Sequence, residues 1–274
     1  MPQAYSSDRG ASVPPQYLYK YLALTSVHTE GAVSTPFLYF SRPADFNDPF
    51  DCKARYTFDS GSADELKSWY RTAIAALVAH DPRSAGKPDR TLAEEYIRRF
   101  PQPDAALKAV AIPVLQADIQ NKLVGILCLS ETGTDPVMFY HYCNNHSGIC
   151  LRFTTRDDSF FLYAEPVAYG EKYPVVEFFD LSDNVRQFKT IFLTKYSGWV
   201  YEKEWRVVDF MNGPGLRQYP PELLSSVIFG MRTTDADKAR VAQWLKTRGH
   251  SVELMQAEQQ NGNYQMKLVT IGKS

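Results

Sequence analysis

Two glutamates separated by one residue form the clearest carboxylate pair in this sequence. Glu202 and Glu204 lie in the segment YEKEWR at 201–206. Side chains at positions i and i+2 of an extended chain project from one face, so the two carboxylates are expected side by side. Like charges that close raise the pKa of one group, and such a pair suits the binding of a cation or of sugar hydroxyls. In the alternative interpretation, Glu202 lies in a loop and pairs with Lys203 or Lys195 in solvent, so that only Glu204 is functional.

A second group of polar and aromatic side chains lies in the segment MFYHYCNNHSG at 138–148. His141, Cys143 and His146 are of the residue types that bind zinc. A zinc site takes about four ligands, usually from paired positions, and the sequence has neither a CxxC motif nor a second histidine pair, so we expect no metal. Tyr140, His141 and His146 follow a predicted central strand, where mixed sheets often bind ligands. The segment is therefore a candidate binding site as well as a packing element.

Several well-known catalytic motifs are absent from the sequence. Nothing fits GxGxxG, GxxxxGK[ST], GxSxG or HExxH, which disfavours dinucleotide-fold oxidoreductases, P-loop enzymes, α/β-hydrolases and zincins. The chain has 30 Lys and Arg against 31 Asp and Glu, which gives a formal net charge of -1. This balance creates no overall field that would steer the protein onto nucleic acid or an anionic membrane, so nucleic-acid binding is unsupported.

Short apolar and aromatic runs predict the strands that position these residues. The segment 124–130 is a near-continuous apolar run, which is typical of a central strand buried on both faces. A helix is expected at 137–143 after the cap Asp135-Pro136, another from Ser182, and a third at 234–249 that ends on a glycine. The other expected strands lie at 17–21, 37–40, 148–153, 160–169, 204–210, 227–230, 252–256 and 264–271. Together these elements predict an α+β protein with a mixed sheet.

The chain divides into three parts by composition. Residues 1–16 are polar and rich in Ser and Pro, so we expect a disordered tail. Residues 17–274 are expected to form a single α+β domain. Within it, residues from about 60 to 122 predict a helical insertion, which opens with the capping box Ser62–Glu65.

Composition also indicates where the protein works. The sequence has no run of 18 apolar residues, and its first residues lack the apolar region of a signal peptide, so no membrane association is expected. Four cysteines in 274 residues are too few for a disulfide scaffold. We therefore expect a cytoplasmic protein.

Five motifs together resemble a large bacterial family that is catalogued as a domain of unknown function. They are LYKY at 18–21, LYFSRPADFNDPFD at 38–51, ILCLSE at 126–131, FYHYCNNHSGICLRF at 139–153 and YEKEWRVV at 201–208. The resemblance covers most of the chain outside the tail and the insertion. One departure is Phe139-Tyr140, where the family favours a tryptophan. The resemblance itself implies no activity.

The order of three short motifs is also similar to that of the ADP-ribosyltransferases. The fold of that family is a split, mixed β-sandwich that binds NAD in a cleft. Its toxin-like branch uses a basic residue on the first strand, a serine on a middle strand and a Glu-x-Glu motif near a late strand. Lys20, Ser130 and the pair Glu202 and Glu204 occur in this order. Lysine stands where that branch has arginine, and Ser-Glu-Thr at 130–132 stands where it has Ser-Thr-Ser.

This similarity implies an enzyme that transfers ADP-ribose from NAD to a macromolecular acceptor or cleaves NAD, in the manner of a bacterial toxin or defence effector. Glu204 would be the essential carboxylate, which holds the nicotinamide ribose and stabilises an oxocarbenium-like transition state. Glu202 and Ser130 would assist it. Aromatic side chains would stack on the nicotinamide ring, and basic side chains would meet the pyrophosphate. The candidate contacts to NAD or another small ligand are Lys20, Tyr140, Tyr142, His146 and Arg152.

Two other functions are consistent with the same residues. A non-catalytic sensor module would hold a ligand or peptide in a cleft around Asn47, Asp48, Tyr142 and His146. Glu204 and Arg206 would then be structural partners of the FNDPFD turn at 46–51. A hydrolase or nuclease would instead bind magnesium, which prefers carboxylates, through Asp48, Asp51, His141 and Glu204.

Overall fold

A computed structural model describes residues 13–57, 59, 61–80, 92–95, 98, 113–114, 116–118, 120–155, 159–180 and 184–274. Its main element is an eight-stranded sheet in the order β14-β13-β12-β5-β1-β4-β10-β6. β12 and β13 are parallel and the other neighbours are antiparallel, so the sheet is mixed and the predicted α+β class is confirmed. The strands are β1 Tyr17–Leu22, β4 Gly125–Ser130, β5 Ile149–Thr154, β6 Glu165–Pro166, β10 Glu204–Asp209, β12 Leu224–Phe229, β13 Glu253–Gln259 and β14 Met266–Lys273.

The sheet is split between β1 and β4. β1 pairs with β5 along all six of its residues, and β4 pairs with β10 along all six, but β1 and β4 share only the pair Tyr19 and Ser130. Beyond that pair, the edge of β4 finds other partners. Ile126 exchanges backbone hydrogen bonds with Ser41, and the Nζ of Lys20 donates to the Cys128 carbonyl at 2.9 Å. One backbone pair and the Lys20 side chain thus link β1 to β4 across the split.

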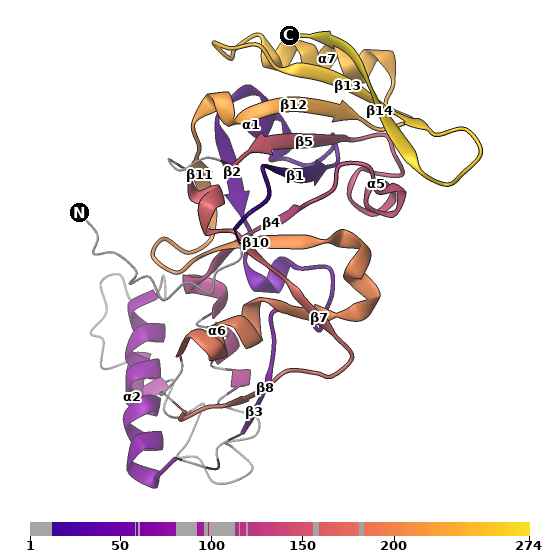
Figure 1. Cartoon of the computed structure of the whole chain (residues 1–274). Coiled ribbons are helices and arrows are strands. Elements are labelled where there is room, and N and C mark those ends of the chain that lie inside the picture. The colour runs from indigo at the N-terminus through magenta and orange to yellow at the C-terminus, as the bar shows by residue number, and fades with distance from the viewer. Residues whose placement is uncertain are drawn as a thin grey trace.

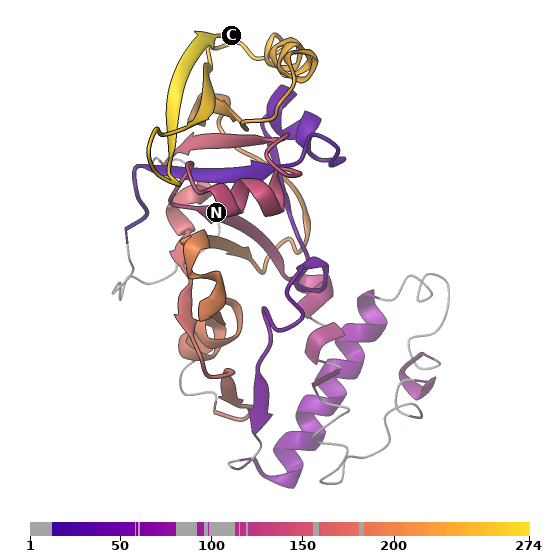
Figure 2. The same cartoon turned by 90° about the vertical axis from the view of Figure 1, so that its right-hand side faces the viewer.

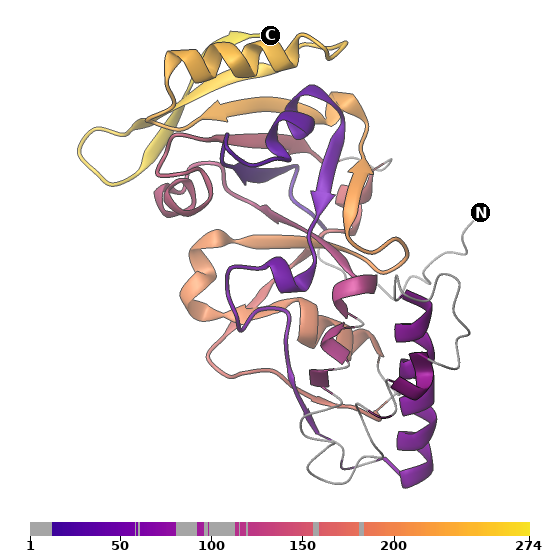
Figure 3. The same ribbon diagram turned by 180° about the vertical axis from the view of Figure 1, so that it is seen from behind.

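Alternating side chains give the sheet two different faces. Leu18, Leu151 and Val227 point to one face, into the core shared with helices α1 (Thr29–Ser34) and α7 (Asp235–Leu245). The residues between them, such as Tyr19 and Cys150, point to the opposite face, which is covered by α5 (Pro136–Tyr142). Figure 2 and Figure 3 show α1 and α7 together on one side of the upper strands. Because β4 has helices or loops on both faces, its apolar run is buried as predicted.

The remaining strands form three two-stranded sheets, and two of these sheets lie below β10 in Figure 1. β2 (Phe37–Phe40) pairs with β11 (Gly215–Gln218), β3 (Arg55–Thr57) pairs with β8 (Val175–Glu177), and β7 (Ala168–Gly170) pairs with β9 (Thr194–Tyr196). Helix α6 (Asn184–Phe192) leads into β9, and a 3-10 helix at Ser197–Glu202 leads from β9 into β10. This last connection carries one of the two candidate glutamates.

Helix α2 (Ala63–His80) lies at the opposite end of the molecule from α7 and β14 (Figure 1). The capping box that opens it is confirmed, since the Ser62 backbone and hydroxyl both donate to Glu65, and Ser62 Oγ accepts from the Glu65 backbone. The rest of the predicted insertion falls largely at positions outside the described residues, as do tail residues 1–12 and Ser182. Among the helices that the structure describes, none has both the length and the apolar character to cross a membrane.

Two sequence predictions of local structure were wrong. The expected strand at 160–169 is a 3-10 helix at Phe160–Tyr163 followed by the short strands β6 and β7, because Phe161 turns inward to fill the main core. The helix expected to reach Gly249 ends at Leu245, so no glycine caps it. The hairpin of β13 and β14 around the Asn-Gly-Asn turn is confirmed, although β13 runs further than predicted.

Candidate functional site

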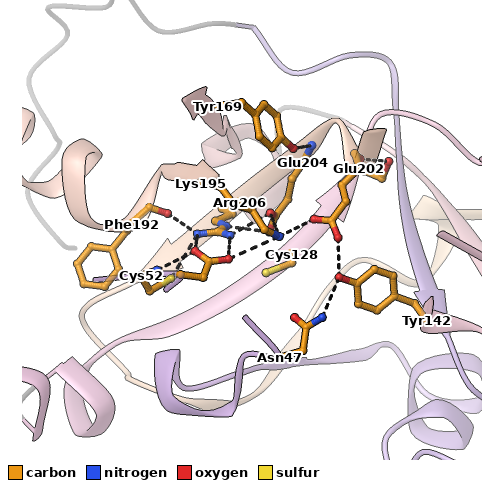
Figure 4. A network of polar contacts seen from close by, with 12 residues as sticks. Asn47, Cys52, Cys128, Tyr142, Tyr169, Phe192, Lys195, Glu202, Glu204 and Arg206 are labelled. Carbon is orange, nitrogen blue, oxygen red and sulfur yellow. Dashed lines mark hydrogen bonds and ion pairs between the residues drawn. The ribbon is translucent and has the colours of Figure 1, made fainter. Parts of the chain in front are cut away.

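Five charged side chains meet near the start of β10. Figure 4 shows Lys195, Glu202, Glu204 and Arg206 among them. The five come from the FNDPFD turn at 46–51, from β9, from the 3-10 helix at Ser197–Glu202, and from β10 itself. Their exposed fractions lie between 0% and 6%. We call this group the charge cluster, and its members are Asp51, Lys195, Glu202, Glu204 and Arg206.

Arg206 is the fully buried member, and all five of its N–H donors are used. Both ends of its guanidinium face Asp51, at 2.9 Å and 2.6 Å, and Glu204 accepts from Nε at 2.8 Å and from Nη2 at 2.9 Å. The remaining donor of Nη1 reaches the Phe192 carbonyl at 2.8 Å. A buried guanidinium is tolerated only with such complete pairing, so these contacts hold β10 to the FNDPFD turn and to the end of α6.

Lys195 lies between the two candidate glutamates. Its Nζ is 2.5 Å from Glu202 Oε2, 3.0 Å from Glu204 Oε2 and 3.5 Å from Asp51 Oδ2. The same ammonium group lies 5.1 Å from the centre of the Trp199 ring. Lys195 is the cation that Glu202 and Glu204 share.

Glu202 is the member of the charge cluster that connects to the surface. Its Oε1 accepts a hydrogen bond of 2.5 Å from the phenol of Tyr142, at the end of α5. The phenol oxygen in turn lies 3.5 Å from Nδ2 of Asn47, whose side chain is exposed. Tyr142 is half-buried, so Glu202 is separated from exposed atoms by one side chain.

The surroundings shift the pKa values of the two glutamates in opposite directions. Burial disfavours the charged form of Glu202 and raises its pKa above the ordinary value, in spite of Lys195. Burial acts against the charge of Glu204 as well, but Arg206 and Lys195 outweigh it and hold the pKa at about 2. Glu204 is thus a permanent anion at neutral pH, whereas Glu202 is the carboxyl group of the pair whose protonation is easier to change.

The geometry predicted for the glutamate pair was wrong, although the residues do meet. Glu202 ends a 3-10 helix, and Lys203 adopts a left-handed conformation with φ of 44°, so only Glu204 lies in the strand. In the alternative interpretation, Glu202 lies outside the strand and pairs with Lys203 or Lys195. The structure confirms that Glu202 lies outside the strand and that its partner is Lys195. That pair is buried, however, and not in solvent, because Trp199 and the start of β10 cover it.

Ser130 lies beside the charge cluster. It is opposite Glu204 in the pairing of β4 with β10, and its hydroxyl donates to the Glu202 carbonyl at 2.6 Å. It also accepts a hydrogen bond from the Thr132 backbone, so the hydroxyl fixes the turn that carries Glu202.

Arg152 and Lys20 lie outside the charge cluster. In the pairing register, Arg152 is opposite Tyr19, Tyr19 is opposite Ser130, and Ser130 is opposite Glu204, so these four residues form one row on one face of the sheet. The row spans three strand spacings, or about 14 Å. Arg152 pairs with Glu253 at 3.0 Å. Lys20 points to the other face and is held by the Cys128 carbonyl across the split.

Tyr140 and His146 are not brought to the charge cluster either. Tyr140 is 57% exposed, and its ring contacts His141 with centroids 5.3 Å apart. His146 stacks on Phe139 at 5.9 Å, and its backbone carbonyl accepts from the backbone N–H of Arg232, in the turn between β12 and α7. Burial and the nearby Arg232 lower the pKa of His146. Of the candidate ligand contacts on α5, only Tyr142 reaches the glutamates.

The residues proposed for a magnesium site have other partners. Asp51 and Glu204 face Arg206, the Asp48 carboxylate accepts from the Phe50 backbone, and His141 is exposed on α5. Among the described residues, no three His, Cys, Asp or Glu side chains form a group that could hold a metal ion.

Sequence reasoning missed the central role of Lys195, and it connected Arg206 with the FNDPFD turn only in the alternative of a binding module, without naming Asp51 as the partner. The one available signal for Lys195 is a lysine inside the apolar segment IFLTKYSGW at 191–199, since a buried lysine requires a carboxylate partner. Asp51 lies 155 positions from Arg206, and no local pattern connects the two. Comparisons of the chain with protein-family models, with curated proteins and with solved structures found no match in any of the three.

Proposed function

We propose that the protein is an ADP-ribosyltransferase-like enzyme that acts on NAD in the cytoplasm. The observation that supports this best is the position of the glutamate pair. Glu202 and Glu204 lie next to Ser130, at the point where the sheet splits between β4 and β1. A split sheet with a serine and a Glu-x-Glu motif at the division is what the similarity to ADP-ribosyltransferases implies.

The row of side chains across the split has the polarity that NAD requires. Arg152 lies at one end and Glu204 at the other, with Tyr19 and Ser130 between them. NAD carries an anionic pyrophosphate and a cationic nicotinamide ring, separated by a ribose. Arginine binds phosphate groups through its planar fork, and carboxylates attract the cationic ring, so the proposed orientation places the nicotinamide at the charge cluster.

The proposed reaction breaks the bond between the nicotinamide nitrogen and C1′ of the ribose. The electron pair leaves with nicotinamide, and the ribose passes through an oxocarbenium-like state that a carboxylate stabilises. A hydroxyl of the acceptor, or water, then adds to C1′ and loses a proton. Both carboxylate oxygens of Glu204 are occupied by contacts with Arg206 and Lys195, whereas one oxygen of Glu202 faces the half-buried Tyr142. We therefore assign the contact with the ribose to Glu202, and the orientation of Glu202 to its neighbours.

Nicotinamide release from NAD by the purified protein tests this function. Wild type is compared with Glu202→Gln, Glu204→Gln and the control Glu258→Gln, whose carboxylate lies in an exposed pair with Lys267 on the β13–β14 hairpin. We expect Glu202→Gln to lower release by about 100-fold or more, the size expected for one lost electrostatic contact in the transition state, while the protein stays folded. Glu258→Gln should leave release unchanged. A folded wild type that neither binds nor cleaves NAD contradicts the proposal.

The acceptor is identified by adding cell lysate to the same reaction. Faster release with lysate, together with label transfer from adenylate-labelled NAD to a macromolecule, indicates a transferase of the toxin or defence type. Release that does not respond to lysate indicates simple NAD cleavage. Growth arrest on expression of wild type, relieved by Glu202→Gln, would support the former.

A non-catalytic binding module is the second candidate, and the pairing of Arg206 with both Glu204 and Asp51 favours it. These three side chains are buried and join β10 to the FNDPFD turn, which is the structural role expected of them in that case. Saturable NAD binding without nicotinamide release would support this candidate. Calorimetric titration with NAD separates it from the enzyme.

A further inference from the structure

The ammonium group of Lys195 contacts the carboxylates of both Glu202 and Glu204. Its Nζ contacts Oε2 of Glu202 and Oε2 of Glu204, while the Oε1 atoms face elsewhere, toward Tyr142 and Arg206 respectively. Glu202 therefore uses one oxygen for the shared ammonium group and one for Tyr142, whereas both oxygens of Glu204 also accept from Arg206. Arg206 holds Glu204 in place, and Lys195 is the cation that lies between Glu204 and Glu202.

We infer that Lys195 is a positioning residue that holds Glu202 beside Glu204 and orients it toward Tyr142. The inference rests on the proposed use of Glu202 in NAD chemistry, and it adds a residue that the ADP-ribosyltransferase similarity does not supply. Lys195 lies 6% exposed behind the glutamates, so it acts through them and not on the ligand.

The position of Lys195 is itself fixed from two sides. The lysine lies in β9, which pairs with β7, and its ammonium group lies over the Trp199 ring of the following 3-10 helix. The hydroxyl of Tyr169, in β7, accepts a hydrogen bond of 2.8 Å from the Glu204 backbone N–H and so ties β7 to the start of β10. A flexible side chain held by a strand and a ring can define the position of its partners.

Removal of the ammonium group changes the electrostatics in a definite direction. Two carboxylates would then face each other in a buried site without the cation between them, and one of them must take up a proton. Glu204 keeps Arg206, so the proton goes to Glu202. Other titratable or charged groups at the site come from every surrounding element: Asp51, Cys52, Cys128, Tyr142, Tyr169, Tyr201 and Arg206. The titration is therefore assigned by variants and not by its midpoint alone.

The direct test follows the protonation of Glu202 by infrared spectroscopy of protein labelled with 13C at the glutamate carboxyl groups. In Lys195→Met, we expect the Glu202 titration to move up by about one pH unit or more, which is the usual influence of a cation at this distance. The additional change Glu202→Gln should remove the shifted signal. Lys195→Arg should restore most of the wild-type midpoint because it keeps the charge. Lys267→Met, in an exposed pair, is the matched control and should change nothing.

If Lys195→Met does not fold, the same titration is done on Lys195→Gln, in which the new side chain is uncharged but polar. The double variant Lys195→Met with Glu202→Gln, which removes both partners of the ion pair, should fold more readily than the single variant. An unchanged Glu202 titration in a folded Lys195 variant overturns the inference.

The enzymatic test separates this inference from the proposed function. If wild type releases nicotinamide, Lys195→Met should lower kcat by about tenfold or more, with KM for NAD within about twofold, and the acid limb of the pH profile should move upward with the infrared midpoint. Lys195→Arg should recover part of kcat. An unchanged kcat and pH profile overturns the positioning role even though NAD is cleaved. The infrared experiment needs no NAD. If the wild type neither binds nor cleaves NAD, the proposed function is contradicted, but the infrared titration still shows whether Lys195 controls the protonation of Glu202.

Discussion

Tyr142 and Glu202 are joined by a hydrogen bond of 2.5 Å from the phenol to Oε1. The bond links the end of α5 to the 3-10 helix before β10, and it puts the Glu202 carboxylate directly behind a half-buried ring. Burial raises the pKa of Tyr142, and the Glu202 carboxylate raises it further, so the phenol remains a donor throughout the neutral range. Tyr142 is thus the side chain that lies between Glu202 of the charge cluster and the exposed Asn47.

Removal of this donor should weaken the fold and alter Glu202. Tyr142→Phe keeps the ring but leaves Oε1 without its phenol, so we expect a loss of about 1–3 kcal/mol in the free energy of unfolding. The pKa of Glu202 should rise further, because a hydrogen bond to its charged form is lost. Urea denaturation measures the first effect. Tyr264→Phe, at a position that is 97% exposed, should show neither.

Arg206 should be the most sensitive position of the charge cluster for stability. Arg206→Met leaves Asp51 and Glu204 buried without their main partner, which costs about 3–5 kcal/mol or prevents folding. Arg206→Lys should restore little, because an ammonium group cannot replace a fork that serves two carboxylates and a carbonyl. Thermal and urea unfolding measure both variants. Arg240→Met, which breaks an exposed pair with Asp237, should cost no more than about 1 kcal/mol, and an equal loss in both variants would contradict this account.

Acid should destabilise the protein through Glu204. The folded-state pKa of about 2 lies below the ordinary 4.5, so its ion pairs stabilise the fold above about pH 4.5, and this contribution disappears as the pH falls toward 2. Glu202 has the opposite sign, since its raised pKa makes protonation easier in the folded state. Denaturation series from pH 2 to 7 should therefore show a steeper loss for wild type than for Glu204→Gln. Parallel curves would show that Glu204 does not carry this dependence.

Lys20 should act as a link across the split in the sheet. Lys20→Met leaves the Cys128 carbonyl without its donor, at a cost of about 1–3 kcal/mol, and should speed hydrogen exchange of amides in β1 and β4. The similarity to ADP-ribosyltransferases implies a different role, in which Lys20 or Arg152 contacts the pyrophosphate of NAD. Weaker NAD binding with unchanged stability would favour that assignment. Lys273→Met, near the chain terminus in β14, serves as the control.

Local patterns were enough to predict the framework of the site. The apolar run at 124–130 identified β4 as a central strand, and Asp135-Pro136 identified the start of α5. The Asp135 carboxylate accepts hydrogen bonds from the first backbone N–H groups of that helix. The YEKEWR motif located both glutamates. These features depend on neighbours within a few residues, which is the range over which burial patterns and capping act.

The sequence by itself therefore determined the α+β class, the strands that carry Ser130 and Glu204, and the cap of α5. Only the tertiary structure decided that Lys195 is shared by Glu202 and Glu204, that Arg206 reaches back to Asp51, and that Arg152, Tyr19, Ser130 and Glu204 form one row. The physical reason is that charges pair through space without a sequence period. A lysine or aspartate that is buried with its partner has the same local sequence signal as one in solvent, so its role appears only when the strands are brought together.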